Sequence, residues 1–237
     1  MFARTFTTLL LLATLPALAQ QEESEGPWSG AASLGYLATS GNTENATLNA
    51  GFELGYAPGL WKHGLRALAI NAAENEATTA EAYELGLKSE REFGESNYLF
   101  GRLDWRKDRF SSYDSQFSQT VGYGRRLIDR ERHRLNAEIG VGARQSDLID
   151  GTSENEFIVR AGLDYLWTLN ETAEFSQLVG VEAGDTNTYI ESVSALKAKL
   201  INELALVLSY TIKHNTDVLP LTEKTDTYTA ISLEYAF

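Results

Sequence analysis

The chain has 237 residues, with 20 lysines and arginines against 33 aspartates and glutamates, and it contains no cysteine. The lack of cysteine excludes a disulfide framework, a cysteine-based zinc site and a cysteine nucleophile. The net charge of −13 argues against nucleic-acid binding, which depends on phosphate contacts from lysine and arginine. Beyond the N-terminal segment, no stretch approaches the roughly 20 apolar residues that span a bilayer as a helix.

The first segment has the three parts of a secretory signal peptide. Arg4 supplies the positive charge, an apolar run from Leu9 to Ala13 follows, and Ala17-Leu18-Ala19 forms an A-x-A cleavage pattern. We therefore expect a signal peptide over residues 1–19. No cysteine follows the cleavage pattern, which excludes a lipoprotein anchor. Residues 20–27 are polar and acidic and are expected to be a flexible lead-in to one domain over residues 28–237.

From residue 28 onward the hydrophobic pattern has the period of a β-strand. The clearest run places Ala46, Leu48, Ala50, Phe52, Leu54 and Tyr56 on one face, against small or polar residues on the other. About twelve such segments follow one another without a linker. The predicted strands cover residues 28–38, 45–57, 61–73, 80–93, 97–107, 114–128, 133–146, 154–168, 173–184, 188–200, 204–216 and 225–237.

The connections between these segments alternate between tight turns and longer loops. An even number of antiparallel strands, with short turns at one end and longer loops at the other, is typical of an outer-membrane barrel. A soluble all-β domain has the same alternation with its apolar face inside, so alternation alone does not separate the two. The sequence predicts an all-β fold, a transmembrane antiparallel up-and-down β-barrel of about twelve strands with both termini periplasmic.

Three further features favour the membrane barrel over the soluble domain. The polar face combines isolated charges with many glycines, which suits a packed lumen. Aromatic residues collect near both ends of the predicted strands, among them Tyr98 at the tight-turn end and Tyr189 and Tyr228 near the long-loop end, as in the two aromatic belts of a membrane protein. The last strand carries Tyr235 and Phe237 on its apolar face, and terminal aromatics of this kind are an assembly signal read through strand addition at an open edge.

Several short motifs carry a resemblance to a known family. They are Ser40-Gly41-Asn42-Thr43, Lys107-Asp108-Arg109-Phe110, Gly122-Tyr123-Gly124, the run from Glu138 to Gly142, and the ending from Thr225 to Phe237. With these motifs the mature chain resembles the family of salt-induced outer-membrane proteins, a domain of unknown function. The resemblance implies a Gram-negative outer-membrane barrel. It carries no catalytic residue and no cofactor.

The charged residues on the inward face are the strongest candidates for a functional site. Both signs occur in similar number, which favours neither a strong anion pore nor a strong cation pore. A lumen of twelve strands is intermediate in width between small filled barrels and large porins. The chain is therefore expected to be a structural barrel or a narrow small-solute channel, and not an enzyme. The lumen-lining candidates are Arg102, Asp104, Arg126, Glu138, Arg144, Arg160 and Asp164.

An outer-membrane lipid hydrolase is the alternative function. Ser192 and Ser194 share the outward face of one predicted strand, and His214 shares the outward face of the next. A serine–histidine pair must be in hydrogen-bond contact, with a third group orienting the histidine, and no third group stands out. No metal-ligand spacing accompanies the histidines, so no metal or cofactor is expected.

The expected partners follow from the membrane location. They are outer-membrane lipids and lipopolysaccharide, the outer-membrane assembly machinery and small solutes, without nucleic acid. Arg106, Lys107 and Arg109 form a basic cluster that we expect on the outside, where it can pair with a lipopolysaccharide phosphate or with Asp108.

Overall fold

The computed structural model describes residues 26–39, 45–74, 77–109 and 111–237, and these residues form twelve β-strands. The signal-peptide prediction, most of the lead-in, the motif Ser40–Thr43 and Phe110 lie outside the described residues. Among the residues described, no helix is long and apolar enough to cross a membrane. The strands are β1 (Trp28–Thr39), β2 (Asn45–Tyr56), β3 (Trp61–Glu74), β4 (Ala77–Phe93), β5 (Asn97–Asp108), β6 (Tyr113–Arg130), β7 (His133–Leu148), β8 (Ser153–Asn170), β9 (Ala173–Ala183), β10 (Thr188–Ile201), β11 (Leu204–Asn215) and β12 (Thr225–Ala236).

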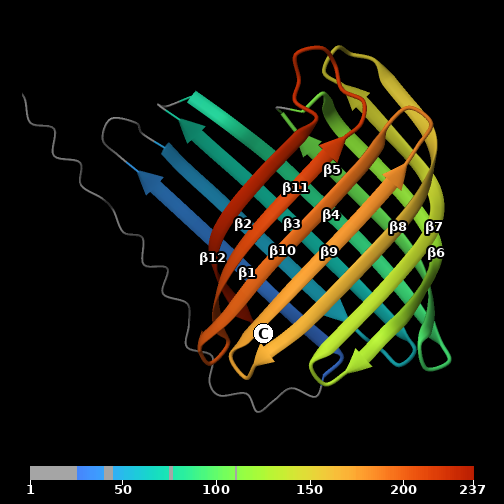
Figure 1. The fold of residues 1–237 in the computed structure, drawn as a ribbon, viewed down its shortest axis with the longest axis vertical. Coiled ribbons are helices and arrows are strands. Elements are labelled where there is room, and N and C mark those ends of the chain that lie inside the picture. The colour runs from blue at the N-terminus through green and yellow to red at the C-terminus, as the bar shows by residue number, and fades with distance from the viewer. Residues whose placement is uncertain (1–25, 40–44, 75–76, 110) are drawn as a thin grey trace, which may run out of the picture.

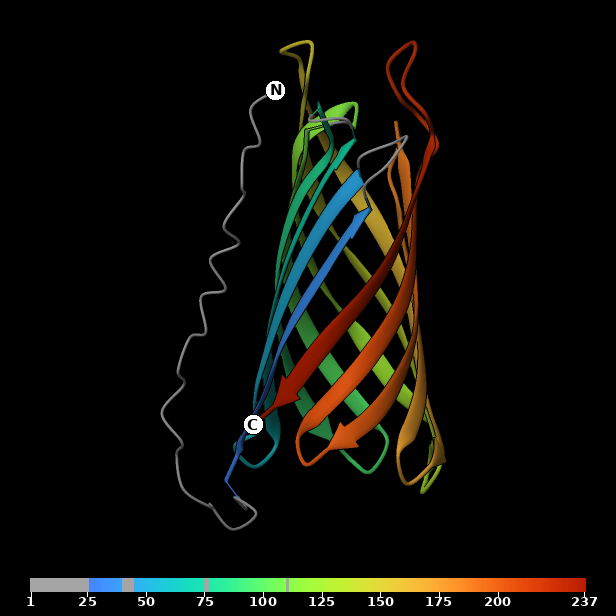
Figure 2. The same cartoon turned by 90° about the vertical axis from the view of Figure 1, so that its left-hand side faces the viewer.

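Each strand pairs with the next in antiparallel register, and β12 pairs with β1, so the sheet closes into a barrel (Figure 1). The predicted fold class and number of strands are confirmed. Tight turns lie at one end of the barrel and longer loops at the other (Figure 2). Gly59 and Gly94 sit in two of the tight turns with φ of 64° and 71°, a conformation that favours glycine.

Alternation along the strands sorts apolar residues to the outside of the wall and polar residues to the lumen. Along β5, for example, Leu99, Leu103 and Trp105 are exposed on the outer face, whereas Asp104 is buried. Large apolar side chains left on the outside of a closed sheet are what a barrel needs to face lipid. Other exposed members of this outer face are Leu34, Leu48, Leu87, Val121, Ile139, Phe157, Leu163, Leu208, Ile231 and Leu233.

Aromatic side chains group at the tight-turn end of the wall. Trp28 stacks on Tyr56 with ring centroids 4.2 Å apart, and His133 lies between Tyr165 and Trp167, 6.1 and 5.8 Å from them. The expected belts were wrong at three residues, because Tyr98, Tyr189 and Tyr228 share the inward parity of their strands and contact lumen charges. Their partners are Glu138, Arg106 and Asp108, respectively.

The closure between β1 and β12 is short. Residue pairs run only from Ala31–Ala236 to Leu34–Leu233, extended below by two backbone hydrogen bonds between Gly30 and Phe237 of 2.8 and 2.9 Å. By contrast, β1 pairs with β2 along its whole length, from Trp28 to Thr39. Figure 2 shows β12 diverging from β1 toward the long-loop end of the barrel.

We predict that Ile139→Arg destabilises the folded barrel by about 2–4 kcal/mol, since a charge placed on the lipid-facing wall loses its hydration. Ile139 is 60% exposed on the outside of β7. The matched control is Ser209→Arg, because Ser209 lines a lumen cavity and an arginine there keeps contact with water. Urea titration of folding into lipid vesicles measures both costs, and equal costs would contradict the assignment of the two faces.

Candidate functional site

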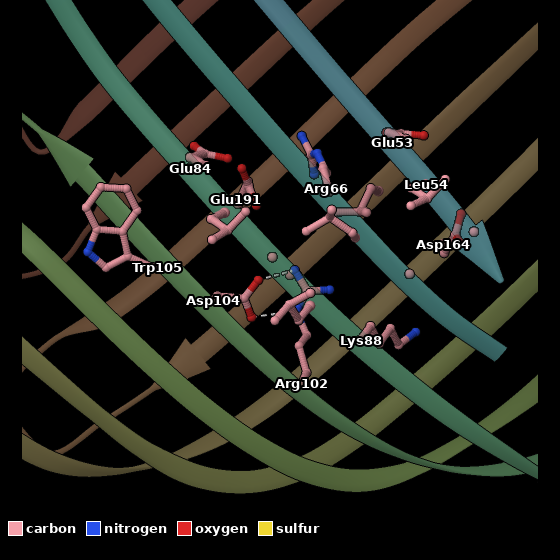
Figure 3. Close-up of a pocket in the computed structure, with 18 of the residues that line it drawn as sticks. Glu53, Leu54, Arg66, Glu84, Lys88, Arg102, Asp104, Trp105, Asp164 and Glu191 are labelled. Atoms are coloured by element: carbon pink, nitrogen blue, oxygen red, sulfur yellow. Dashed lines mark hydrogen bonds and ion pairs between the residues drawn. The ribbon is translucent and has the colours of Figure 1, made fainter. Parts of the chain in front are cut away.

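The lumen contains a series of connected cavities. A central cavity of about 570 Å³ (Figure 3) shares Glu53, Arg66 and Asp164 with a second cavity of about 490 Å³ behind β1 and β12. Toward the tight turns it shares Glu90 and Asp164 with a third cavity of about 590 Å³. Most of the lumen between the tight turns and the middle of the wall is therefore space that solvent can fill.

The side chains of the central cavity come from both sides of the barrel. Arg102 on β5 donates two hydrogen bonds to Asp104, of 2.5 and 2.7 Å, and lies beside it in Figure 3. Arg66 faces Glu53 across the β2–β3 pairing. Among the residues described, Arg66 and Glu53 have no ion-pair partner within 4.0 Å, so this part of the cavity keeps charges available to a solute.

Charges near the tight-turn end are held in local pairs. Lys88 pairs with Glu138 and also with Glu90, the latter at 2.7 Å. The Tyr98 hydroxyl donates to Glu138 at 2.8 Å. Arg126 pairs with Glu92 in the same way, and Lys62 joins that carboxylate at 2.8 Å. These groups stand along the wall, and the cavity of about 590 Å³ remains between them.

A compact ionic cluster fills the long-loop half of the lumen on the side of β5 to β9. Its centre is the carboxylate of Glu182, whose side chain is 1% exposed. Arg106 donates to it at 2.7 Å, Arg160 at 3.1 Å and the Ser118 hydroxyl at 3.0 Å. Residues from four strands meet at one carboxylate, so the cluster ties β5 and β6 to β8 and β9 across the lumen.

Arg144 extends this cluster toward the loop between β9 and β10. Its side chain is 0% exposed and donates to Glu156 at 2.6 Å and to the carbonyl oxygen of Asn187 at 2.5 Å. Glu156 also accepts the backbone N–H of Thr186 at 3.1 Å. The guanidinium and carboxylate therefore fix the 183–188 loop over the lumen.

The passage narrows to a throat beside this cluster. A cavity of only about 30 Å³ lies between Glu84, Arg106, Tyr189 and Lys213, which is about the volume of one water molecule in the liquid. Lys213 pairs with Glu84, and the Arg106 guanidinium lies 4.0 Å from the Tyr189 ring centroid. Glu84, Arg106 and Tyr189 also line the central cavity, so the throat connects directly to it.

The structure distributes the predicted lumen residues over two environments. Arg102, Asp104, Arg160 and Asp164 line the central cavity, and Arg126 lines the cavity near the tight turns. Glu138 and Arg144 line none of the cavities described, because their carboxylate and guanidinium are engaged in ion pairs.

The throat was not predicted from the sequence. The expected outer position of Arg106 was wrong, since Arg106 shares the inward parity of Arg102 and Asp104 and pairs with Glu182. Its neighbours Lys107 and Arg109 pair instead with Asp114 at 3.6 Å and Glu81 at 3.0 Å. Alternation along β5 was the signal for this position, because it puts Arg106 on the same face as Arg102 and Asp104.

The serine and histidine of the hydrolase alternative do not form a pair. Ser192 lies opposite Ile212, two residues along β11 from His214, and such diagonal neighbours are about 7–8 Å apart. The Ser192 hydroxyl accepts a hydrogen bond from Gln177 at 2.9 Å, while His214 Nδ1 is 2.8 Å from the Thr225 hydroxyl. Within the described ranges, no group of three histidine, aspartate or glutamate side chains is arranged to hold a metal ion.

We predict that Arg144→Ala destabilises the barrel by about 3–5 kcal/mol, because it leaves the Glu156 carboxylate buried and without its cation. Arg109→Ala is the control, since Arg109 is 65% exposed in its pair with Glu81 and an exposed pair contributes about 0–1 kcal/mol. Urea denaturation of the refolded protein gives both values. Similar losses for the two variants would show that the Arg144 cluster contributes little to stability.

The chain is similar in sequence or fold to several known proteins. An uncharacterised protein of Escherichia coli (strain K12), YdiY, is 31% identical over 211 residues, which cover 89% of this chain and 83% of the relative. An outer-membrane channel from Pseudomonas putida F1 superposes with a TM-score of 0.49 at 9% identity over 89% of this chain and 94% of the other. The NanC porin gives a TM-score of 0.49 at 8% identity over 87% and 97%. Residues 32–237 match the family described as "Protein of unknown function, DUF481", and the chain belongs to this family.

Proposed function

We propose that the protein is a narrow channel for small solutes in the bacterial outer membrane. The observation that carries this proposal is the series of cavities that share residues from the tight-turn mouth to the throat. A barrel that served only as a structural element has no need of charged, solvent-sized space along its axis. The paired charges of the wall keep the cavities polar, and this suits ions and small hydrophilic solutes.

The unpaired charges of the central cavity favour cations. Among its described residues, the carboxylates without an ion-pair partner are Glu53, Asp164 and Glu191, and the cation without one is Arg66. All other cations of this cavity are neutralised by a neighbouring carboxylate. A solute therefore meets an excess of negative charge, although the inward charges of the whole barrel are of both signs in similar number.

A sealed structural barrel is the second candidate, and the throat is the observation that favours it. A space of about 30 Å³ between Glu84 and Tyr189 admits water but no hydrated solute. Conduction through this throat therefore requires the Arg106–Tyr189 contact to part, whereas a structural barrel keeps it closed. No contact in the described residues favours the lipid hydrolase.

We further propose the orientation and partners that go with this role. The tight turns and the ends of β1 and β12 near them lie on the periplasmic side, and the longer loops lie outside, as in other barrels of this kind. Residues 1–19 direct export. Tyr235 and Phe237 project outward from the closing strand, where the assembly machinery reads them. The loops contact lipopolysaccharide.

We predict that purified protein in planar bilayers conducts weakly and prefers cations, and that Tyr189→Ala raises the conductance by removing the ring at the throat. Tyr83→Ala is the control, because Tyr83 is exposed on the outside of β4. Reversal potentials in a potassium chloride gradient measure selectivity, which Glu53→Gln should lower. If neither the wild-type protein nor Tyr189→Ala conducts ions, the channel proposal is wrong and the sealed structural barrel is the remaining candidate function.

Surface labelling tests the orientation. The chain has no cysteine, so single cysteines report cleanly. We predict that Asp150→Cys, in the exposed loop after β7, reacts with a membrane-impermeant maleimide on intact cells. Glu171→Cys, in the tight turn between β8 and β9, should react only after lysis. The reverse pattern of reactivity would invert the topology.

A further inference from the structure

The backbone pairing between β1 and β12 stops partway along the two strands. Their pairing ends at Leu34–Leu233, although β1 continues to Thr39 and β12 begins as far up as Thr225. Above this point each strand has a partner on one side only, β2 for β1 and β11 for β12. Every other pair of neighbouring strands shares at least eleven residue pairs, against four between β1 and β12.

A side-chain hydrogen bond closes the wall just above the last backbone pair. The Ser232 hydroxyl on β12 donates to Asn49 Oδ1 on β2 at 2.6 Å, and both side chains are buried. This bond passes over Gly35 of β1, where a Cβ atom would collide with the Asn49 amide and with the carbonyl oxygen of Ile231. Gly35 is thus required for β2 to reach β12, and the bond acts as a latch across the seam.

The cavity behind this seam is unlike the rest of the lumen. The cavity of about 490 Å³ is bounded by β1 and β12 on the near side, through Ser33 and Ser232. It is also lined by inward-facing aliphatic residues of β3, β9, β10 and β11: Leu68, Ile70, Leu178, Val193 and Val207. An aliphatic surface inside a lumen has no role for a purely hydrophilic solute, since water gains nothing from contact with it.

The floor of the same cavity is charged. Among the residues described, the carboxylates of this cavity without an ion-pair partner are Glu53, Asp164 and Glu174, and the cation without one is Arg66. Lys197 is paired with Glu234 at 2.6 Å. An aliphatic wall above a net acidic floor is complementary to a molecule with one hydrocarbon chain and a cationic head group. On the outside, Leu34 and Tyr36 flank the seam and are 60% and 68% exposed on the lipid-facing surface.

We propose that the seam between β1 and β12, above the Ser232–Asn49 latch, is a lateral portal through which a single-chain cationic amphiphile passes between the membrane and this cavity. The proposal deepens the proposed small-solute channel by naming a class of solute and its path. The chain slides between two strand edges that are not joined to each other, and the head group moves to the carboxylates of the floor.

The test uses full-length protein in phosphatidylcholine vesicles and a diazirine-bearing hexadecyltrimethylammonium as the probe. Light-activated labelling of peptides from β9 to β11, at inward residues such as Val193, reports entry. Tyr36→Cys with Ile231→Cys places two thiols on the two edges above the latch. Bridging them with a short bis-maleimide should lower lumen labelling several-fold relative to the same variant capped with N-ethylmaleimide.

Three controls isolate passage through the seam from general effects of cross-linking, substitution and head-group charge. Leu34→Cys with Leu233→Cys bridges strands that are already paired, so labelling should not change. Ser232→Ala should raise labelling by releasing the latch, whereas Ser209→Ala, in the same cavity but outside the latch, should not. A diazirine-bearing palmitate, which has the same chain and an anionic head, should label less than the cationic probe.

The outcomes distinguish this proposal from the channel. Labelling that is unchanged by the bridge, or confined to outward residues, overturns the portal even if the protein conducts ions. A bridge that forms only between two barrels shows that the edges cover each other in a dimer and also overturns it. Bridge-sensitive labelling in a protein that is silent in planar bilayers supports the portal and removes the ion channel.

Discussion

The constraint on which this structure depends is that backbone amides and carbonyls must find hydrogen-bond partners where lipid offers none. A sheet meets this requirement only by closing on itself, as the twelve strands do. Closure then leaves two surfaces, and alternation, interrupted by bulges near some strand ends, assigns the side chains to one or the other. Leucine, valine and aromatic residues cover most of the outside, so most charged residues in the middle of the strands occupy the lumen.

Confinement of these charges explains how the lumen divides. In the long-loop half, the carboxylate of Glu182 is surrounded by Arg106, Arg160 and Ser118, and little space remains. In the central part, pairs such as Arg102–Asp104 lie along the wall and leave an open cavity. Ion pairs that span the lumen therefore close the long-loop half of the barrel. Ion pairs of the same residue types that follow the wall leave a passage open in the central part.

The sequence predicted the fold almost completely because the fold depends on period and turn spacing, which are local. The strand limits, the closed antiparallel order and the outward face follow from alternation. The interactions across the lumen did not follow, since Arg106 and Glu182 are 76 residues apart and their contact depends on the width of the barrel. The positions of Tyr98, Tyr189 and Tyr228 were also predicted wrongly. They were expected in the aromatic belts because they are close to strand ends, but alternation along each strand places their side chains in the lumen.

The seam also escapes prediction from alternation, because a pattern within one strand does not say how far two strands remain paired. Its position has a consequence for how the barrel is made. The latch joins residues 183 positions apart, and the backbone pairs between β1 and β12 join residues still farther apart in the sequence. Contacts of such large sequence separation form late, because their entropy cost is met only after the rest of the structure is in place. The β1–β12 junction is therefore the last part of the wall to form, and with the fewest backbone bonds it is the first to separate when the barrel unfolds.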